Sequence, residues 1–345
     1  MVHELAERGV LEGERGRYAC STVVSEISVP ATLTAAALIV CFAAGLRRSA
    51  QAGDKASLAI AMTGLVSEHM RHARMREGLQ LSAEQMALVE SIGDPALAVG
   101  AAFAAISIKA QNGEMTDAMQ WAQTTIDWAA GDTAKTGLVV ASPLAIALAF
   151  RCTARWWLGR PGWREDLDEA LAIARNADPW TVGFVNAWVY GNAVHTGVLA
   201  IDDTAMGELE QALQIAEASG DDTVLGSVKY TFATVLTSRG RASDRHRRIE
   251  MLVQVRDMCL HHRFPMCELP VVEAFSGYER ARGSDRDRGL SQMRKALDDL
   301  FIGGQYMYGI GTTTPPGADA ARPRRRGRPD RSRGGGRAAG DGRWR

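Results

Sequence analysis

The chain has 345 residues, of which 46% are hydrophobic and only 6% aromatic, and its formal charges sum to zero. A core of this composition must be built mainly from Ala, Leu, Ile, Val and Met, which suits close-packed helices because alanine is the best helix former. The five cysteines are odd in number, scattered and without a Cys-x-x-Cys pair, which argues against a disulfide framework and favours a reducing, cytoplasmic compartment.

Residues 1–35 are expected to form a small unit distinct from the rest of the chain. A helix that ends at Gly9 is followed by two short segments that can pair as a hairpin across the glycine-containing loop 12–16. Charged residues occur throughout the first part of this unit, so it lacks the apolar region of a secretory signal peptide.

Residues 27–46 carry no charge and have about the length that a bilayer span requires. Pro30 interrupts this segment, and its continuous apolar part, 35–46, has a length more typical of a buried helix than of a span. We therefore predict a connecting helix over 36–53 and no membrane partner.

One pattern recurs through residues 54–311. Each unit begins with an aspartate in a short turn: Asp54, Asp94, Asp132, Asp178 and Asp221. These aspartates are separated by 40, 38, 46 and 43 residues, and a period near 40 is typical of helical repeats. A glycine or alanine before the aspartate can end one helix, and the aspartate can cap the next by accepting bonds from its free amides.

Two helices fit into each period. The first is the more apolar of the pair, as in 96–110, 138–158, 182–199 and 224–237. The second is amphipathic, with apolar residues at helical spacing, as in 85–92, 115–122, 166–174, 207–216 and 290–300. The predicted fold is all-α: antiparallel helix pairs stacked into a helical-repeat solenoid, in which the helix with neighbours on both sides is the more apolar one.

The amino-acid composition changes at residue 312. Residues 312–345 contain ten Arg, three Asp and no Lys or Glu, a charge of +7, so the rest of the chain carries −7. With almost no large aliphatic residue, this tail is predicted to be disordered. Its arginines favour weak, sequence-independent contact with nucleic acid, although Trp344 is the only aromatic side chain available to stack on bases. We favour the alternative, that the tail is GC-rich DNA read out of frame.

Motifs for catalysis or cofactor binding are not found in the sequence. It has no phosphate-binding loop of the Gly-x-x-x-x-Gly-Lys type, no His-Glu-x-x-His and no Gly-x-Ser-x-Gly, so we predict a non-enzyme without a cofactor. Cys259, His261, His262 and Cys267 are residue types that ligate zinc, but their spacing is wrong for a zinc finger. A helix C-terminus, where histidines interact favourably with the helix dipole, is the preferred interpretation.

A cluster of aromatic residues is the best candidate for a ligand groove. Six of the fourteen Trp and Tyr residues fall between Trp156 and Tyr190. The candidate groove residues are Arg151, Arg155, Trp156, Trp188 and Tyr190, because exposed Trp and Arg side chains anchor partners. The alternative, which we favour, is that the aromatic rings fill the core.

Three stretches resemble parts of a known family. Residues 5–18 with 29–33 look like the winged-helix end of a signal-transduction P-loop ATPase (STAND) module. Residues 53–62 through 93–95, and 158–167, resemble the TPR-like tail of the same proteins. These are large bacterial regulators that carry an adenylate or guanylate cyclase domain, or a LuxR-type DNA-binding domain, beside the ATPase and the helical repeats.

The resemblance implies a sensor array without its enzyme, since neither the cyclase aspartates nor the ATPase loop can be placed on this chain. We expect a non-catalytic binding or sensor module of a signal-transduction or transcriptional regulator, whose partner is a protein, a peptide or a small ligand. The alternative is a truncated piece whose function follows the parent adenylate cyclase or LuxR-type regulator. Apolar faces near 58–66 and 301–308 would be exposed at the ends of a cut array and favour self-association.

Overall fold

The computed structural model describes residues 53–129 and 142–313, and within these ranges every regular element is a helix. The all-α prediction is therefore confirmed for this part of the chain. The predicted winged-helix-like unit 1–35, nearly all of the connecting helix 36–53 and the tail from 314 onward lie outside the described residues. No helix of the described residues is both long enough and apolar enough to cross a membrane.

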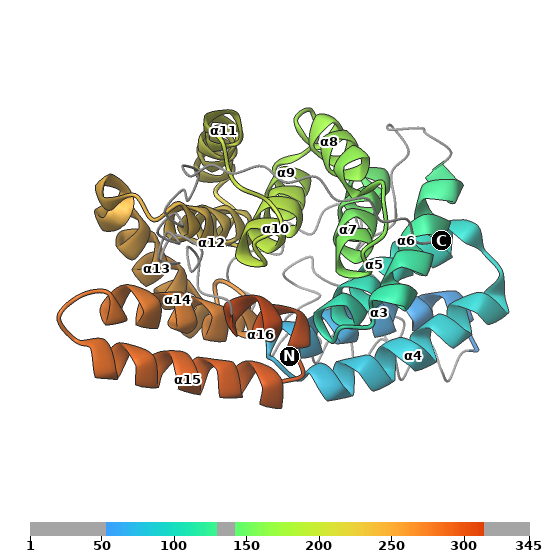
Figure 1. Ribbon diagram of the computed structural model, residues 1–345. Helices are drawn as coiled ribbons and strands as arrows, with labels where there is room; N and C mark the ends of the chain where they lie inside the picture. The colour runs from blue at the N-terminus through green and yellow to red at the C-terminus, as the bar shows by residue number, and fades with distance from the viewer. Residues whose placement is uncertain (1–52, 130–141, 314–345) are drawn as a thin grey trace, which may run out of the picture.

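Figure 1 shows the arrangement of the helices in the described residues. Their bounds are α3 Lys55–Arg71, α4 Met75–Ile92, α5 Pro95–Gln111, α6 Met115–Ala129, α7 Pro143–Trp157, α8 Trp163–Ala174, α9 Pro179–Asn186, α10 Asn192–His195, α11 Asp203–Ser219, α12 Asp222–Arg239, α13 Arg245–Leu260, α14 Leu269–Ala281, α15 Arg286–Ile302 and α16 Tyr306–Thr313. A π-helical turn, Ala187–Gly191, joins α9 to α10, and 3₁₀ turns precede α13 (Ala242–Asp244) and α14 (Met266–Glu268).

The predicted aspartate caps are confirmed at every position that the structure describes. Asp54 accepts a bond from the Ser57 amide at 3.1 Å and so starts α3. Asp94, Asp178 and Asp221 cap α5, α9 and α12 in the same way, each through backbone amides two or three residues ahead. The fifth aspartate, Asp132, lies outside the described residues.

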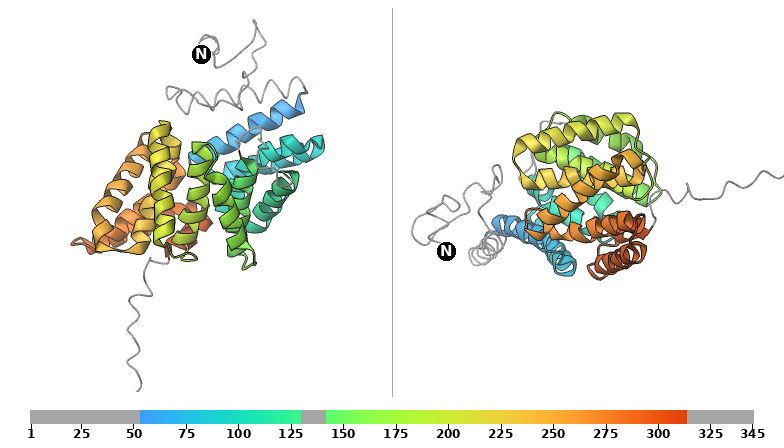
Figure 2. Two further views of the ribbon diagram at one scale, coloured as in Figure 1. Left: turned by 90° about the horizontal axis from the view of Figure 1, so that it is seen from above. Right: turned by 90° about the vertical axis from the view of Figure 1, so that its left-hand side faces the viewer.

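The predicted difference between the two helices of a pair is seen for α5 with α6 and for α7 with α8. Helices α5, α7 and α12 bury side chains around most of their circumference, whereas α4, α6 and α8 bury one face. Adjacent helices pack against each other in chain order from α3 to α8 and again from α11 to α16. The apolar helices therefore form an inner layer, and the amphipathic helices cover it (Figures 1 and 2).

The last helix returns to the beginning of the array. α16 packs against α5 and α10 as well as against its neighbours α14 and α15. The Gln305 amide, just ahead of α16, donates to Gln111 Oε1 at 3.3 Å, a contact across 194 positions of sequence. The described helices are consequently curled so that α16 lies beside the early helix α5 (Figure 1).

Candidate functional site

Two of the five predicted groove residues lie in the core. Trp188 and Tyr190 are both buried in or beside the π-helical turn Ala187–Gly191. The Trp188 ring meets the Phe150 ring edge-on, with centroids 4.7 Å apart. The Tyr190 hydroxyl donates to Glu208 Oε2 at 2.5 Å, and burial, with help from this carboxylate, raises the pKa of Tyr190 well above its usual value. These two rings stabilise the interior and are not presented to a partner.

The third aromatic, Trp156, is half-buried at the end of α7. Its ring packs edge-on against Trp163 at the start of α8, with centroids 6.2 Å apart. Its indole Nε1 is enclosed and has no hydrogen-bond partner among the described residues. Trp156 therefore packs two neighbouring helices together and does not meet Trp188 or Tyr190 in a shared groove.

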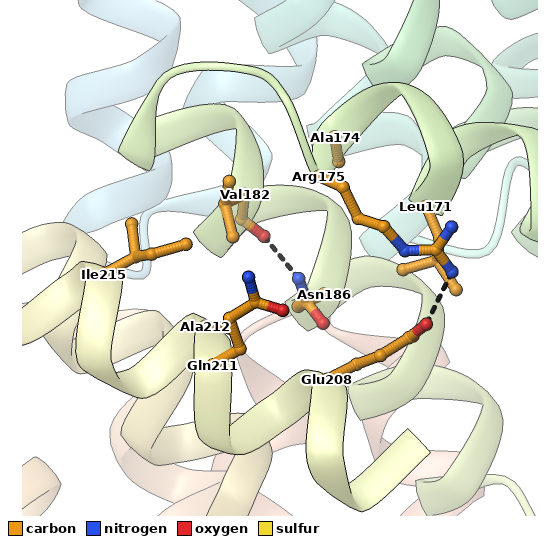
Figure 3. Close-up of a pocket in the computed structure, with 9 residues that line it drawn as sticks. All are labelled: Leu171, Ala174, Arg175, Val182, Asn186, Glu208, Gln211, Ala212 and Ile215. Atoms are coloured by element: carbon orange, nitrogen blue, oxygen red, sulfur yellow. Dashed lines mark hydrogen bonds and ion pairs between the residues drawn. The ribbon is translucent and has the colours of Figure 1, made fainter. Parts of the chain in front are cut away.

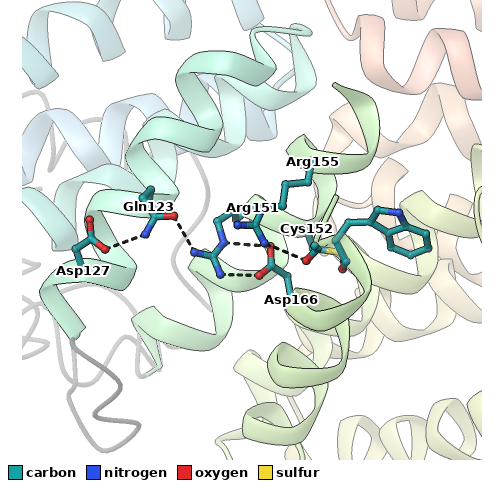
Figure 4. Close-up of polar contacts among 8 residues, drawn as sticks. Gln123, Asp127, Arg151, Cys152, Arg155 and Asp166 are labelled. Carbon is teal, nitrogen blue, oxygen red and sulfur yellow. Dashed lines mark hydrogen bonds and ion pairs between the residues drawn. The ribbon is translucent and has the colours of Figure 1, made fainter. Parts of the chain in front are cut away.

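The two arginines converge on one buried carboxylate, Asp166, which is 2% exposed (Figure 4). Arg151 donates to both oxygens of this carboxylate, from Nε at 3.0 Å and from Nη2 at 2.6 Å. Arg155 adds a third bond to Asp166 at 2.8 Å and a bond to the Gly162 carbonyl at 3.0 Å. Arg151 also reaches Gln123 on α6 at 2.8 Å, so the cluster joins α6, α7 and α8.

The Asp166 cluster is expected to contribute to stability. Replacing Asp166 by alanine leaves two partly buried cations without their shared partner, and we expect a loss of about 3 kcal/mol in the free energy of unfolding. Urea denaturation followed by circular dichroism measures this change. The exposed pair Lys295–Asp299 is the control, since Asp299→Ala should cost below about 0.5 kcal/mol. Equal losses in the two variants would contradict the structural role of Asp166.

A thiol beside this cluster is unsuited to nucleophilic chemistry. Cys152 is fully buried on α7 and donates to the Trp163 carbonyl at 3.1 Å. Burial raises its pKa far above the usual range for a thiol, and the nearby Asp166 charge adds to this shift. Because the thiolate is the reactive form, Cys152 is an inert core residue.

A pocket lies where α8, α9 and α11 meet (Figure 3). Arg175 from α8 and Glu208 from α11 form an ion pair of 2.5 Å at this pocket. Asn186, 5% exposed, donates through Nδ2 to the Val182 carbonyl at 2.8 Å, and its Oδ1 is enclosed without a hydrogen-bond partner among the described residues. One hydrogen-bond acceptor, Asn186 Oδ1, therefore remains unused on one side of the pocket.

The size of the pocket decides what it can hold. Its volume is about 30 Å³, which is room for an ordered water near Asn186 Oδ1. Pockets for small organic ligands typically measure about 300–1,000 Å³. The pocket at Asn186 is therefore too small for an organic ligand of this kind.

A second aromatic group lies on the opposite face of α9. Trp180 and Phe184, one helical turn apart, stack at 5.2 Å, and Phe103 of α5 meets both rings edge-on at 5.4 and 5.2 Å. All three rings are half-buried. Sequence reasoning included Trp180 in its aromatic cluster but did not single out Phe103 or Phe184, because their proximity depends on packing between helices far apart in the chain.

The four candidate metal ligands point to separate contacts. Cys259 donates to the Pro265 carbonyl at 3.4 Å, and Cys267 Sγ lies 3.8 Å from Glu268 Oε1. His261 Nδ1 lies 2.7 Å from the Asp257 carbonyl oxygen. His262 stacks on His72 of α3, with ring centroids 6.2 Å apart. Within residues 53–129 and 142–313, no group of three or more His, Cys, Asp or Glu side chains is placed to hold a metal ion.

Comparison of the chain with models of protein families, with curated proteins and with solved structures gives no match.

Proposed function

We propose that the chain is a TPR-like helical-repeat binding module of a signal-transduction or transcriptional regulator, and that its partner is a protein or a peptide. Two features support this proposal: the recurring capped helix pairs, and the resemblance of residues 53–95 and 158–167 to the tails of STAND regulators.

The observation that carries the proposal is the surface at the end of the array. Phe301, Ile302, Tyr306 and Ile310 on α15 and α16 are 39%, 73%, 40% and 51% exposed. We call these four residues the terminal patch. In a repeat array the next helix pair would stack on such a surface, and exposed apolar patches mark interaction sites. At the other end the expected exposure is not seen, since Ala59, Met62 and Val66 of α3 are buried.

We infer that the terminal patch accepts the apolar face of another protein's helices, and that in the purified chain a second copy takes this place. A standard stable interface buries roughly 800 Å² on each partner, more than four side chains can supply. The association of the isolated chain should therefore be weak and concentration-dependent.

Self-association tests this inference. We expect the wild-type chain to sediment with a concentration-dependent mass, and Ile302→Glu to lower its association constant at least about tenfold, because a charge must then be desolvated in the contact. Val253→Glu is the matched control, since Val253 on α13 is 51% exposed but lies outside the patch. A wild-type chain that stays monomeric at high concentration, or an equal effect of both variants, would contradict the role of the patch.

The enzymatic alternative is tested separately with purified chain and nucleotides. Isothermal titration with ATP and GTP should give no binding heat, and assays for ATP hydrolysis and cyclic nucleotide formation should stay at background. Tight nucleotide binding or turnover would overturn the assignment as a non-catalytic module.

A further inference from the structure

The connection between α16 and the other described helices, called the body below, points to a conformational switch. α16 follows α15 through Gly303 and Gly304, and Gly304 has a φ of +78°, in the left-handed region that favours glycine. Met307 and Tyr308 of α16 are buried against the body, whereas Tyr306 and Ile310 remain exposed. One short helix, held by a glycine joint, thus closes the curled array.

Buried polar contacts hold this helix in place. Gln305 is 1% exposed, and its Nε2 donates to the Cys267 carbonyl at 3.0 Å and to Gln111 Oε1 at 3.3 Å. His195 of α10 lies parallel to the Tyr308 ring at a centroid distance of 6.4 Å. The contact therefore joins α16 to α5, to α10 and to the 3₁₀ turn Met266–Glu268.

A carboxyl group lies inside this contact. Glu268 ends the 3₁₀ turn, and although the residue is half-buried overall, its Oε2 is fully enclosed and meets no donor in good hydrogen-bond geometry. Its carboxyl interacts with the Tyr308 hydroxyl and with the Cys267 thiol, whose Sγ lies 3.8 Å from Oε1. Burial raises the pKa of Glu268 from 4.5 to about 7.

The other titratable groups around Glu268 stay neutral near pH 7. Tyr230 from α12, Tyr308 from α16, and the thiols of Cys259 and Cys267 all have pKa values raised by burial. Burial lowers the pKa of His195 to about 4, so this imidazole is uncharged as well. The positive charge of Arg71 on α3 lowers the pKa of Cys267 and so partly opposes the effect of burial there.

We propose that α16 is a pH-sensitive latch, which stays docked on the body while the Glu268 carboxyl is protonated and is released when that carboxyl ionises. The Tyr308 hydroxyl and the Cys267 thiol favour the ionised carboxylate, but the cost of burying its charge outweighs both contacts. Release of α16 gives the carboxylate access to water and removes this cost. Release would also free the buried face of Met307 and Tyr308, on the same helix that carries Tyr306 and Ile310 of the terminal patch.

The direction of the effect follows from proton binding. The docked state binds the Glu268 proton up to about pH 7, and the released state loses it near the ordinary value of 4.5. Docking is therefore strongest below pH 4.5 and weakens as the pH rises toward 7, with a plateau above. The equilibrium constant for release should rise roughly 30-fold between pH 5.5 and pH 8.

Hydrogen exchange with mass spectrometry tests the latch on the full chain. After correction for intrinsic exchange rates, protection of peptides from 303–313 should fall roughly 30-fold between pH 5.5 and pH 8 in the wild type. Glu268→Gln, which keeps a neutral group of the same shape, should remove this pH dependence. Glu273→Gln is the matched control, because Glu273 is a more accessible carboxylate paired with Arg256 on the surface, and this variant should behave like the wild type.

A second measurement keeps the proposal testable if Glu268→Gln folds poorly. Labelling of Cys267 by a thiol reagent, corrected for thiol ionisation, should rise with pH in the wild type, while labelling of the equally buried Cys152, far from α16, should not. Gln305→Ala should expose Cys267 at every pH. Wild-type protection of 303–313 that is independent of pH, or a Glu268→Gln variant with the wild-type profile, would overturn the latch.

Discussion

Substitution of Gly289 by alanine is expected to lower the free energy of unfolding by about 3 kcal/mol. Gly289 is buried on α15 where this helix crosses α14. A Cβ added there would lie 2.6 Å from the Gly277 carbonyl oxygen and 2.8 Å from Ala281 Cα. Both are backbone atoms of a packed helix, so no side chain can rotate away and the two helices must separate.

Urea denaturation of the variant measures this cost, and the chain offers a matched control. Gly207 is exposed in the interior of α11, and a Cβ added there has no atom within 4 Å. Gly207→Ala should therefore stabilise the chain by about 0.5–1 kcal/mol, because alanine loses less backbone entropy on folding. A Gly289→Ala variant as stable as Gly207→Ala would show that α14 and α15 do not pack this closely.

The second large effect is expected at a buried ion pair. Arg248 of α13 and Glu279 of α14 are 2% and 3% exposed, with two hydrogen bonds of 2.7 and 3.0 Å between them. Arg248 also donates to the Arg241 carbonyl at 2.8 Å. Glu279→Ala leaves the guanidinium buried without its partner, and we expect a loss of about 3–5 kcal/mol in the free energy of unfolding.

The double variant Arg248→Met, Glu279→Leu separates the cost of an unpaired charge from the contribution of the pair. If desolvation offsets most of the attraction within the pair, the double variant should recover most of the stability that Glu279→Ala loses. Thermal and urea unfolding of the wild type, Glu279→Ala and the double variant give the comparison. A double variant as unstable as Glu279→Ala would contradict this expectation and show that the pair itself stabilises the fold strongly.

Local features of the fold were predictable because they depend on residues close together in sequence. An aspartate after a helix end can cap the next helix wherever it occurs, and Asp54, Asp94, Asp178 and Asp221 all do so. The spacing of these caps indicated helix pairs near the observed positions. The π-helical turn Ala187–Gly191 was not anticipated, because its extra residue leaves no mark in the apolar periodicity.

The candidate site was less accessible from sequence. The favoured interpretation of the aromatic cluster as core describes Trp188 and Tyr190, which are buried. Arg151 and Arg155 were considered as ligand anchors, but their shared carboxylate, Asp166, lies on the next helix and was not recognised as their partner. Nothing in the local pattern marks Gln305 or Glu268, whose surroundings are assembled from helices throughout the chain.

The contact between Gln305 and Gln111 also has a consequence for the order of folding. Each helix hairpin from α3 onward can form from neighbouring residues, which is fast, whereas a contact across 194 positions requires closing most of the chain into a loop. During synthesis the early helices would emerge and pair long before α16 is made. Gln111 would then lack its contact with Gln305, which is still to be synthesised. Closure of the array should therefore be the last step of folding, and the inner surface near Gln111 is the one most in need of protection until the chain is complete.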